Sequence, residues 1–437
     1  MRRFLCILAA VLCAGSLMAQ RGKPYAPVTL RLEHRDGVYQ KGETVRVWAD
    51  VGPDTDASLL LRVTTNGLFW EEKTLSLQEG SSVVLEQSYD KPIWVRLNLG
   101  PARDRNIAAQ TGFIVAPEEM TPGFPEPEDF MPWWQEQLAA MRAVPAQAKL
   151  LAVESPEAGI RVWKLEIPMH EGNPVRGYLA MPDGAAPGSL PIFFYAHPAG
   201  SATAAHTHAS AQQAASFARK GAISLDINAH GILDDAPAEY YARMDTTELL
   251  LYQERPVRDR ESYYFRLMFL RLVRALDYLC TLPEWDGKRV LVRGESQGGA
   301  QSFALAGLDP RVSAVVATVP AMTDLGGSLQ ERQCGWPYQL RPMVPLSSHG
   351  KAALPYFDGA LFLKHYKGEL FVEAGLIDVT CPPCAVAAGF NNSAASRKEI
   401  HFWPGRGHNY WSDKASNDAW EKIVLLARDQ YIDNYLR

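Results

Sequence analysis

The sequence predicts an α/β protein with a mostly parallel sheet in its larger C-terminal part and a small all-β domain before it. The 437 residues exceed the usual size of a single domain, so two domains are expected. Residues 27–115 carry β-branched side chains in near alternation and show no helical period. From about residue 128, short apolar runs alternate with stretches of helical period, which is typical of strands covered by helices on both faces.

The N-terminus has the layout of a secretory signal peptide. Two arginines precede an apolar run that begins at Phe4, and small residues follow near Ala19. The run is shorter than the roughly 20 residues that cross a bilayer, which disfavours a membrane anchor. Leu12 stands before Cys13 where a lipoprotein would have a small residue. We therefore expect cleavage of residues 1–19, a periplasmic or secreted protein, and no membrane span.

Residues 22–115 are expected to form a β-sandwich. Strands are predicted in "VTLRLEHRD", "ETVRVWADV", "SLLLRVTTNG" and "SSVVLEQSY", which Gly, Asp and Pro residues separate. The following "APEEMTPGFPEPEDF" is rich in proline, so residues 116–127 are interpreted as a linker.

Residues 128–437 carry the α/β pattern. An amphipathic helix is predicted in "DFMPWWQEQLAAMRAV", and a pair of strands in "IRVWKLEIPM" and "PVRGYLAMP". Further strands are expected in "LPIFFYAHP", "GAISLDIN", "KRVLVRGES", "SAVVATVP", "GELFVEAG" and "KEIHFWPG". Helices are expected near residues 204–219, 262–282 and 416–435, and from residue 297.

Ser296 stands in a G-x-S-x-G pattern, "GESQG", between a predicted strand and a predicted helix. In the α/β-hydrolase fold this pattern forms a nucleophile elbow, where the serine occupies a strained turn. The following helix directs its N-terminal N–H groups toward the anionic intermediate of acyl transfer. The local context therefore favours Ser296 as a nucleophile over a serine in an ordinary turn.

A serine hydroxyl needs a histidine base, which lies downstream in this fold. His408 follows a predicted strand in the loop "GRGHNYW" and is the expected base. His401 lies inside that strand, His349 in a loop without a framing strand, and His365 on a predicted helix.

The carboxylate that orients the base is expected between the serine and the histidine in chain order. Asp378 directly follows the predicted strand in "LFVEAGLIDVTCPP", whereas Glu373 lies inside it and Asp358 outside any strand end. Ser296, Asp378 and His408 therefore occur in the required order, each at the C-terminal end of a predicted strand.

Acyl transfer also needs two N–H donors for the oxyanion. Gln297, after the nucleophile, supplies the first, and the second is expected in "YAHPAGS". Pro198 has no N–H, which leaves His197, Ala199 or Gly200; Ala199 is the candidate we name.

Two long segments are distinctive, "RESYYFRLMFLRLVRALDYL" and "PEWDGKRVLVRGESQGGAQSFALAGLDPRVSAVVATVP", and so are the motifs "GLIDVTCPP" and "KEIHFWPGRGHNYW". These stretches resemble the acetyl xylan esterase and cephalosporin C deacetylase family, carbohydrate esterase family 7. The resemblance covers about residues 128–437. It implies a Ser-Asp-His esterase that removes acetyl groups from carbohydrates, without a metal or another cofactor. Carried over by motif, the nucleophile, acid and base are again Ser296, Asp378 and His408.

Some features depart from the family pattern. "HPAGS" replaces the usual tyrosine followed by Asn-Gly-Gly, and Pro198 falls near the tyrosine position. "DINAHGI" replaces D-T-R-G-Q-G, so His230 is expected near the site, and His197 and His230 are candidates for substrate binding. Family members often form hexameric rings, so a homo-oligomer is conceivable, although the added N-terminal domain could block it.

Other functions stay open. Esterases for larger or aromatic acyl groups, and peptidase-like hydrolases, share the fold. A metal-binding protein could use His197, His206, His208 and His230, and a sugar-binding protein could stack sugar rings on Trp48, Trp70 and Trp94. A net charge of −5 does not suggest nucleic acid as a partner. The pairing of Cys280, Cys334, Cys381 and Cys384 is left open.

Overall fold

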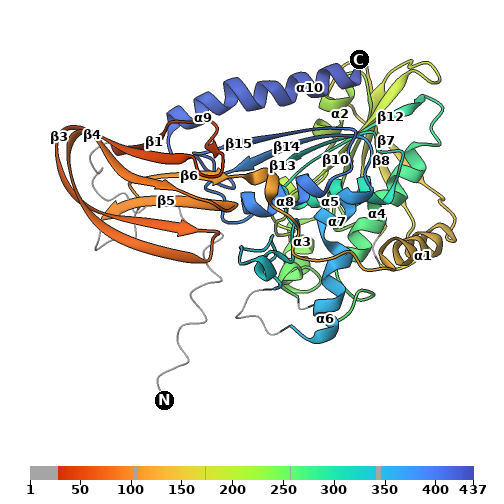
Figure 1. Cartoon of the computed structure of the whole chain (residues 1–437). Helices are drawn as coiled ribbons and strands as arrows, with labels where there is room; N and C mark the ends of the chain where they lie inside the picture. The colour runs from red at the N-terminus through yellow and green to blue at the C-terminus, as the bar shows by residue number, and fades with distance from the viewer. Residues whose placement is uncertain (1–27, 102–106, 173, 256, 341–345) are drawn as a thin grey trace.

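The computed structural model describes residues 28–101, 107–172, 174–255, 257–340 and 346–437 (Figure 1). The predicted signal peptide lies outside the described residues. Among the residues that are described, no helix combines the length and the apolar character needed to cross a membrane.

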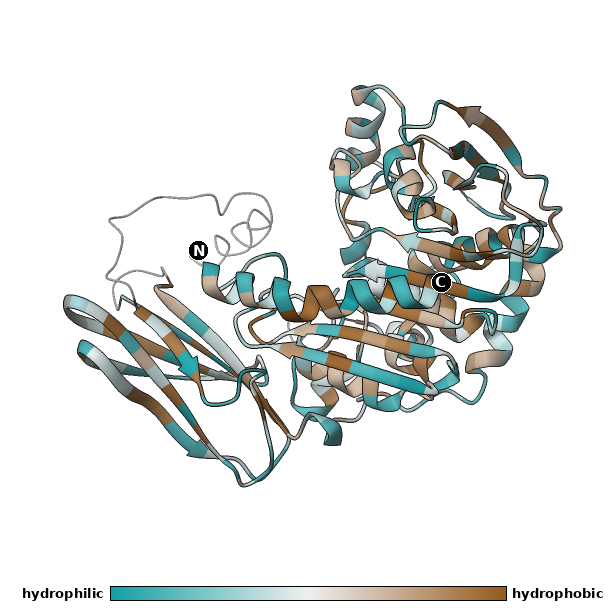
Figure 2. Ribbon diagram, turned by 90° about the horizontal axis from the view of Figure 1, so that it is seen from above, coloured by the Kyte–Doolittle hydropathy of each residue, from teal (hydrophilic) through white to brown (hydrophobic). Residues whose placement is uncertain are grey.

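The N-terminal part forms one curled, six-stranded sheet in the order β1-β3-β5-β6-β2, with β4 paired to β3 (Figure 1). Its strands are β1 (Val28–Leu32), β2 (Val38–Tyr39), β3 (Thr44–Thr65), β4 (Phe69–Ser88), β5 (Ile93–Pro101) and β6 (Ala109–Val115). Hydropathy alternates in bands along these strands (Figure 2). The inward residues form a core of their own that contains Tyr39, Val47, Leu97 and Phe113. The division of this region into two packed sheets stays a prediction.

The C-terminal part is built on a nine-stranded sheet in the order β15-β14-β13-β12-β10-β11-β9-β8-β7. Its strands are β7 (Lys149–Val153), β8 (Ile160–Ile167), β9 (Val175–Pro182), β10 (Leu190–Ala196), β11 (Ile223–Ile227), β12 (Trp285–Glu295), β13 (Ala314–Thr318), β14 (Glu369–Gly375) and β15 (Arg397–Trp403). The strands from β10 to β15 pair in parallel, and β7, β8 and β9 pair antiparallel at one end.

Helices cover both faces of this sheet. The helices of this part are α1 (Phe130–Arg142), α2 (Ala211–Ala218), α3 (Ala238–Thr246), α4 (Phe265–Leu279), α5 (Gln297–Leu308), α6 (Ser348–Ala353), α7 (Gly359–His365), α8 (Pro383–Asn392), α9 (Lys414–Trp420) and α10 (Leu426–Leu436). In Figure 1, α2 and α10 lie above the sheet, while α4, α5, α7 and α8 lie below it.

The parallel strands are continuous apolar runs because helices cover both faces of the sheet. On β10, Ile192 and Phe194 belong to the large core beneath the sheet, whereas Phe193 packs with α10 residues above it. Successive side chains of a strand point to opposite faces, so a strand buried on both faces is apolar at every position. The α/β-hydrolase fold predicted from this pattern is confirmed.

Several elements differ in extent from the predictions. The two strands expected around residues 43–51 and 58–67 form the single strand β3, with an irregularity in its pairing between Val51 and Asp56. The helix expected near residues 204–219 begins only at Ala211, after Ser210 caps it. The C-terminal helix is divided by a π-helical turn over Glu421–Leu425.

Candidate active site

Ser296 occupies a tight turn between β12 and α5. Its backbone has φ 55° and ψ −118°, a conformation that is rare for a residue with a side chain. A Cβ on Gly294 would lie 2.1 Å from the carbonyl oxygen of Gly298, and a Cβ on Gly298 would lie 2.1 Å from that of Ala196. Both glycines are therefore required by the close approach of strand, helix and the end of β10. The geometry is that of a nucleophile elbow.

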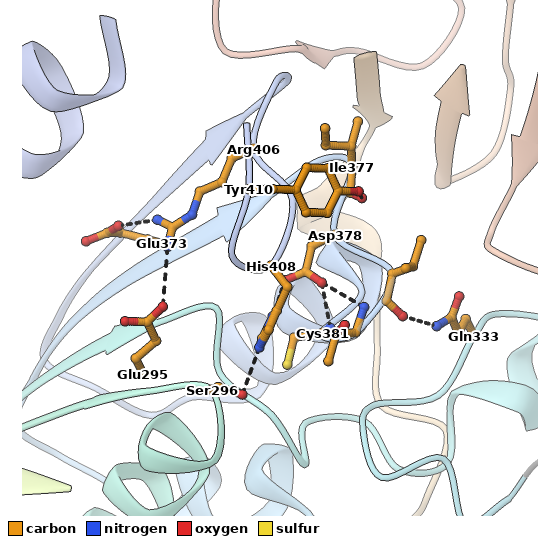
Figure 3. Close-up of polar contacts among 12 residues, drawn as sticks. Glu295, Ser296, Gln333, Glu373, Ile377, Asp378, Cys381, Arg406, His408 and Tyr410 are labelled. Carbon is orange, nitrogen blue, oxygen red and sulfur yellow. Dashed lines mark hydrogen bonds and ion pairs between the residues drawn. The ribbon is translucent and has the colours of Figure 1, made fainter. Parts of the chain in front are cut away.

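The structure brings Ser296, His408 and Asp378 into one hydrogen-bonded series (Figure 3). The Ser296 hydroxyl lies 2.9 Å from His408 Nε2, and His408 Nδ1 lies 2.8 Å from Asp378 Oδ2. With a neutral imidazole, Ser296 donates to Nε2 and Nδ1–H donates to the carboxylate. Asp378 is fully buried, and its Oδ1 accepts the backbone N–H groups of Thr380 and Cys381. This arrangement can transfer a proton from the hydroxyl to the imidazole.

The surroundings of His408 raise its pKa and so stabilise the imidazolium that forms during catalysis. Burial acts to lower the pKa of His408, but its contacts with Cys381 and its hydrogen bond to the Asp378 carboxylate reverse that effect and raise the pKa above its ordinary value. Burial raises the pKa of the Cys381 thiol, so the thiol is protonated at neutral pH. The Asp378 carboxylate is then the charge that stabilises the imidazolium.

Cys381 lies beside the series. Figure 3 draws its sulfur close to His408 and Ser296, and one ligand atom each of Asp378, Cys381 and His408 lie within 4.8 Å of one another. Within the described ranges this is the only trio of potential metal ligands, and it contains none of the four histidines of the metal-binding hypothesis. No disulfide joins Cys280, Cys334, Cys381 or Cys384 in the described part of the chain.

A buried carboxylate that the sequence prediction left without a role holds the His408 loop (residues 404–413). Glu373, inside β14, is 1% exposed, and its carboxylate contacts Arg406 Nη1 at 2.8 Å and Arg428 Nη1 at 3.3 Å. Arg406 also lies 3.9 Å from Glu295, the residue before Ser296, and its carbonyl accepts the N–H of Ile377 at 3.1 Å (Figure 3). Arg406 thus ties three strand ends together.

We predict that Glu373→Gln lowers the free energy of unfolding by about 3–5 kcal/mol, because it leaves two buried guanidinium groups without their carboxylate. Denaturant unfolding measures the change. The matched control is Glu399→Gln, which removes a half-exposed partner of His401 on β15 and is expected to change the free energy by less than about 1 kcal/mol. Equal stability of the two variants would contradict the role given to Glu373.

The loop after β10 lies against the start of α5. The carbonyl of His197 accepts the side-chain amide of Gln301 at 2.9 Å. The Tyr252 hydroxyl donates to the side-chain carbonyl of Gln297 at 2.6 Å. The choice of Ala199 over His197 and Gly200 as the second oxyanion donor stays a prediction.

His197 and His230 are both 2% exposed and have partners inside the protein. His197 Nε2 lies 2.5 Å from Asp226 Oδ1, and its Nδ1 lies 2.9 Å from the His206 carbonyl. His230 Nδ1 lies 2.8 Å from the Tyr264 hydroxyl, and burial lowers the pKa of His230 to about 3. These contacts give the two histidines a packing role beneath the loop, so the predicted contact with substrate stays a prediction.

The three tryptophans of the sugar-binding hypothesis differ in environment. Trp94 is buried, Trp48 lies under the guanidinium of Arg31 at 4.6 Å, and Trp70 is exposed. They do not form one surface for stacking against a sugar, because Trp94 is directed into the core of the C-terminal part.

Comparison with known proteins places residues 118–422 in the family model described as acetyl xylan esterase (AXE1). The chain is 27% identical over 421 residues to the acetyl esterase Axe7A of Xylanibacter ruminicola, covering 92% of each chain. Among solved structures, the acetyl xylan esterase from Paenibacillus sp. R4 is similar, with a TM-score of 0.56, 24% identity, and 71% of this chain and 98% of that chain covered. Acetyl xylan esterase 1 from Thermoanaerobacterium sp. JW/SL YS485 has a TM-score of 0.55 and 23% identity over 71% of this chain and 97% of its own.

Proposed function

The chain belongs to the acetyl xylan esterase family, and we propose that it is an exported serine esterase that removes O-acetyl groups from carbohydrate through Ser296, His408 and Asp378. The observation that carries this proposal is the hydrogen-bonded series of the three side chains at the ends of β12, β15 and β14. Members of this family are carboxylic ester hydrolases that act on acetylated carbohydrate.

The reaction proceeds in two halves. His408 Nε2 accepts the proton of the Ser296 hydroxyl as Oγ attacks the acetyl carbonyl carbon, and Asp378 stabilises the imidazolium. The tetrahedral intermediate collapses when the imidazolium protonates the sugar oxygen, which leaves as an alcohol. Water, deprotonated by His408, then attacks the acetyl-serine and releases acetate.

The oxyanion of both intermediates is bound by the N–H groups of Gln297 and Ala199. Gln297 begins α5, where backbone N–H groups lack helical partners and the helix dipole favours negative charge. Ala199 is the second donor we name, because Pro198 has no N–H and the loop after β10 lies against the start of α5.

The division of the chain belongs to the same proposal. Residues 1–19 act as a signal peptide, residues 22–115 form a β-sandwich domain, and residues 116–127 connect it to the esterase domain of residues 128–437. The support is the sequence pattern of the N-terminus and the two separate cores of the described part.

A series of p-nitrophenyl esters of increasing acyl length, together with acetate release from acetylated xylan, tests the substrate class. We expect kcat/KM to be highest for the acetyl ester and to fall at least about tenfold from acetyl to hexanoyl, because binding discrimination of added methylenes amounts to about 10–200-fold. Faster hydrolysis of hexanoyl or hydroxycinnamoyl esters would favour a large-acyl esterase. Cleavage of peptide substrates without acetate release would favour a peptidase-like enzyme.

A further inference from the structure

The N-terminal sheet meets the rest of the protein at the two loops that carry Asp378 and His408 (Figure 1). Most inward residues of β5 and β6 form the separate N-terminal core. Trp94 of β5 and Ile114 of β6 instead belong to the large core of the C-terminal part. The two parts are therefore joined by a shared apolar interior at this place.

Trp94 holds the Asp378 loop (residues 376–382) where it leaves β14. Its indole Nε1–H donates to the carbonyl of Leu376 at 2.8 Å, and both groups are buried. Leu376 precedes Asp378 by two positions, and its own N–H donates to the carbonyl of Trp403 at 2.9 Å. The orientation of the Leu376 peptide, from which the chain turns toward Asp378, is thus fixed by a side chain of the N-terminal sheet.

A second contact holds the same loop on the other side of Asp378. The side-chain amide of Gln333 donates to the carbonyl of Val379 at 2.6 Å (Figure 3). Gln333 is itself placed by the turn between β3 and β4, because its backbone N–H donates to the carbonyl of Asn66 at 2.8 Å. Leu376 and Val379 bracket Asp378. The Leu376 carbonyl has its donor in the N-terminal sheet, and the Val379 carbonyl accepts the Gln333 amide as well as the Tyr338 hydroxyl at 2.7 Å.

The donors Trp94 and Gln333 are both held by the turn between β3 and β4, which contains Asn66 and Gly67. The N–H of Asn66 donates to the carbonyl of Trp94 at 2.7 Å, and the N–H of Trp94 donates to Asn66 Oδ1 at 3.0 Å. Gly67 lies against the Trp94 ring, since a Cβ there would be 3.1 Å from it and 2.3 Å from the Gln333 side chain. A displacement of this turn would reach both ends of the Asp378 loop.

Strand β6 makes a matching contact with the His408 loop. The N–H of Gly112 donates to the carbonyl of Pro404 at 3.1 Å, at the start of that loop. A Cβ on Gly112 would lie 2.1 Å from the carbonyl oxygen of Leu376. The backbone of β6 therefore packs directly on both loops, which only glycine at this position permits.

We propose that the N-terminal sheet is a positioning element of the active site, in which Trp94, acting through Leu376, and Gln333, acting through Val379, hold the Asp378 carboxylate against His408. The inference rests on the proposed function, because it operates through the roles given to Asp378 and His408. A displacement of about 1 Å in a reacting constellation reduces rates by as much as about 100-fold, so these hydrogen bonds to loop carbonyls affect turnover.

The test uses Trp94→Phe, which removes the indole N–H but keeps an aromatic ring, and Gln333→Met, which removes the amide at similar length. We expect kcat for p-nitrophenyl acetate to fall roughly tenfold or more in each variant, with KM little changed. The acid limb of the pH profile of kcat/KM is expected to move to lower pH, because a displaced Asp378 no longer raises the pKa of His408 as strongly. Rates are expressed per active site, counted by labelling Ser296 with a fluorophosphonate.

Counting active sites separates positioning from folding, since a loss of folded protein lowers the count but moves neither kcat per site nor the pH limb. Trp48→Phe, a tryptophan of β3 in the same sheet, is the matched control and is expected to match the wild type. Should Trp94→Phe fail to fold, the Gln333→Met variant, which changes a half-buried side chain, tests the positioning role. If the folded variants keep the kcat of the wild type and the same acid limb in the pH profile of kcat/KM, the positioning role is wrong. A wild-type enzyme that neither reacts with the fluorophosphonate nor hydrolyses acetyl esters would instead overturn the proposed function.

Discussion

Replacement of Ser296 by alanine is expected to lower kcat for acetyl ester hydrolysis by about 10⁶-fold, the size of effect that follows removal of a serine nucleophile from such a series. The variant lacks the hydroxyl that forms the acetyl-enzyme, and the hydroxyl of Ser302 on α5 donates to the carbonyl of Gly298 at 2.8 Å within the helix. Residual hydrolysis would come from binding and the oxyanion donors alone.

Steady-state hydrolysis of p-nitrophenyl acetate and mass spectrometry after fluorophosphonate treatment measure the effect of Ser296→Ala. The matched control is Ser302→Ala, a buried serine on the same helix, which we expect to retain wild-type turnover and labelling. Hydrolysis by Ser296→Ala within tenfold of the wild type would remove Ser296 from the mechanism.

The elements that position these residues could be predicted from the sequence because their signals are local. Parallel strands buried on both faces are continuous apolar runs, and the glycines around Ser296 mark a turn that admits no side chains. Strand ends on one edge of a parallel sheet lie together, so the chain order of Ser296, Asp378 and His408 was enough to predict that they meet.

The supports of the site could not be predicted in the same way, because they depend on pairs that are distant in sequence. Glu373 is 33 residues from Arg406 and 55 from Arg428, and nothing near Glu373 in the sequence indicates a buried ion pair. A charged residue inside an apolar strand is the available signal, since a buried charge requires a partner. The partner itself is set by tertiary packing.

The N-terminal sheet illustrates a second limit. Gly52 and Pro53 predict a turn, yet β3 continues through them, and its pairing with β4 resumes at Asp56 after a shift in register. Trp94 was a candidate for contact with sugar, and only the register of β5 and β6 against the Asp378 loop directs its indole inward. Strand propensity gives no information about which neighbour a strand face will meet.

The Asp378→Asn variant is expected to lower kcat by about 10⁴-fold through the wrong imidazole tautomer. Oδ1 of residue 378 accepts the N–H groups of Thr380 at 2.7 Å and Cys381 at 2.9 Å, so the amide oxygen of asparagine would keep that position. Its NH₂ group would then face His408 Nδ1, which must accept the hydrogen bond. The proton would reside on Nε2, and the imidazole could no longer accept the proton of Ser296.

The pH dependence separates this effect from a change in folding. The base acts when unprotonated, so kcat/KM of the wild type falls as the pH drops through the raised pKa of His408. Asparagine removes the negative charge that stabilises the imidazolium, so the residual activity of the variant is expected to persist to lower pH. Asp413→Asn, at the exposed N-cap of α9, is the control, because asparagine caps a helix as well as aspartate does. An acid limb at the same pH in Asp378→Asn and the wild type would show that another group sets the pKa of the base.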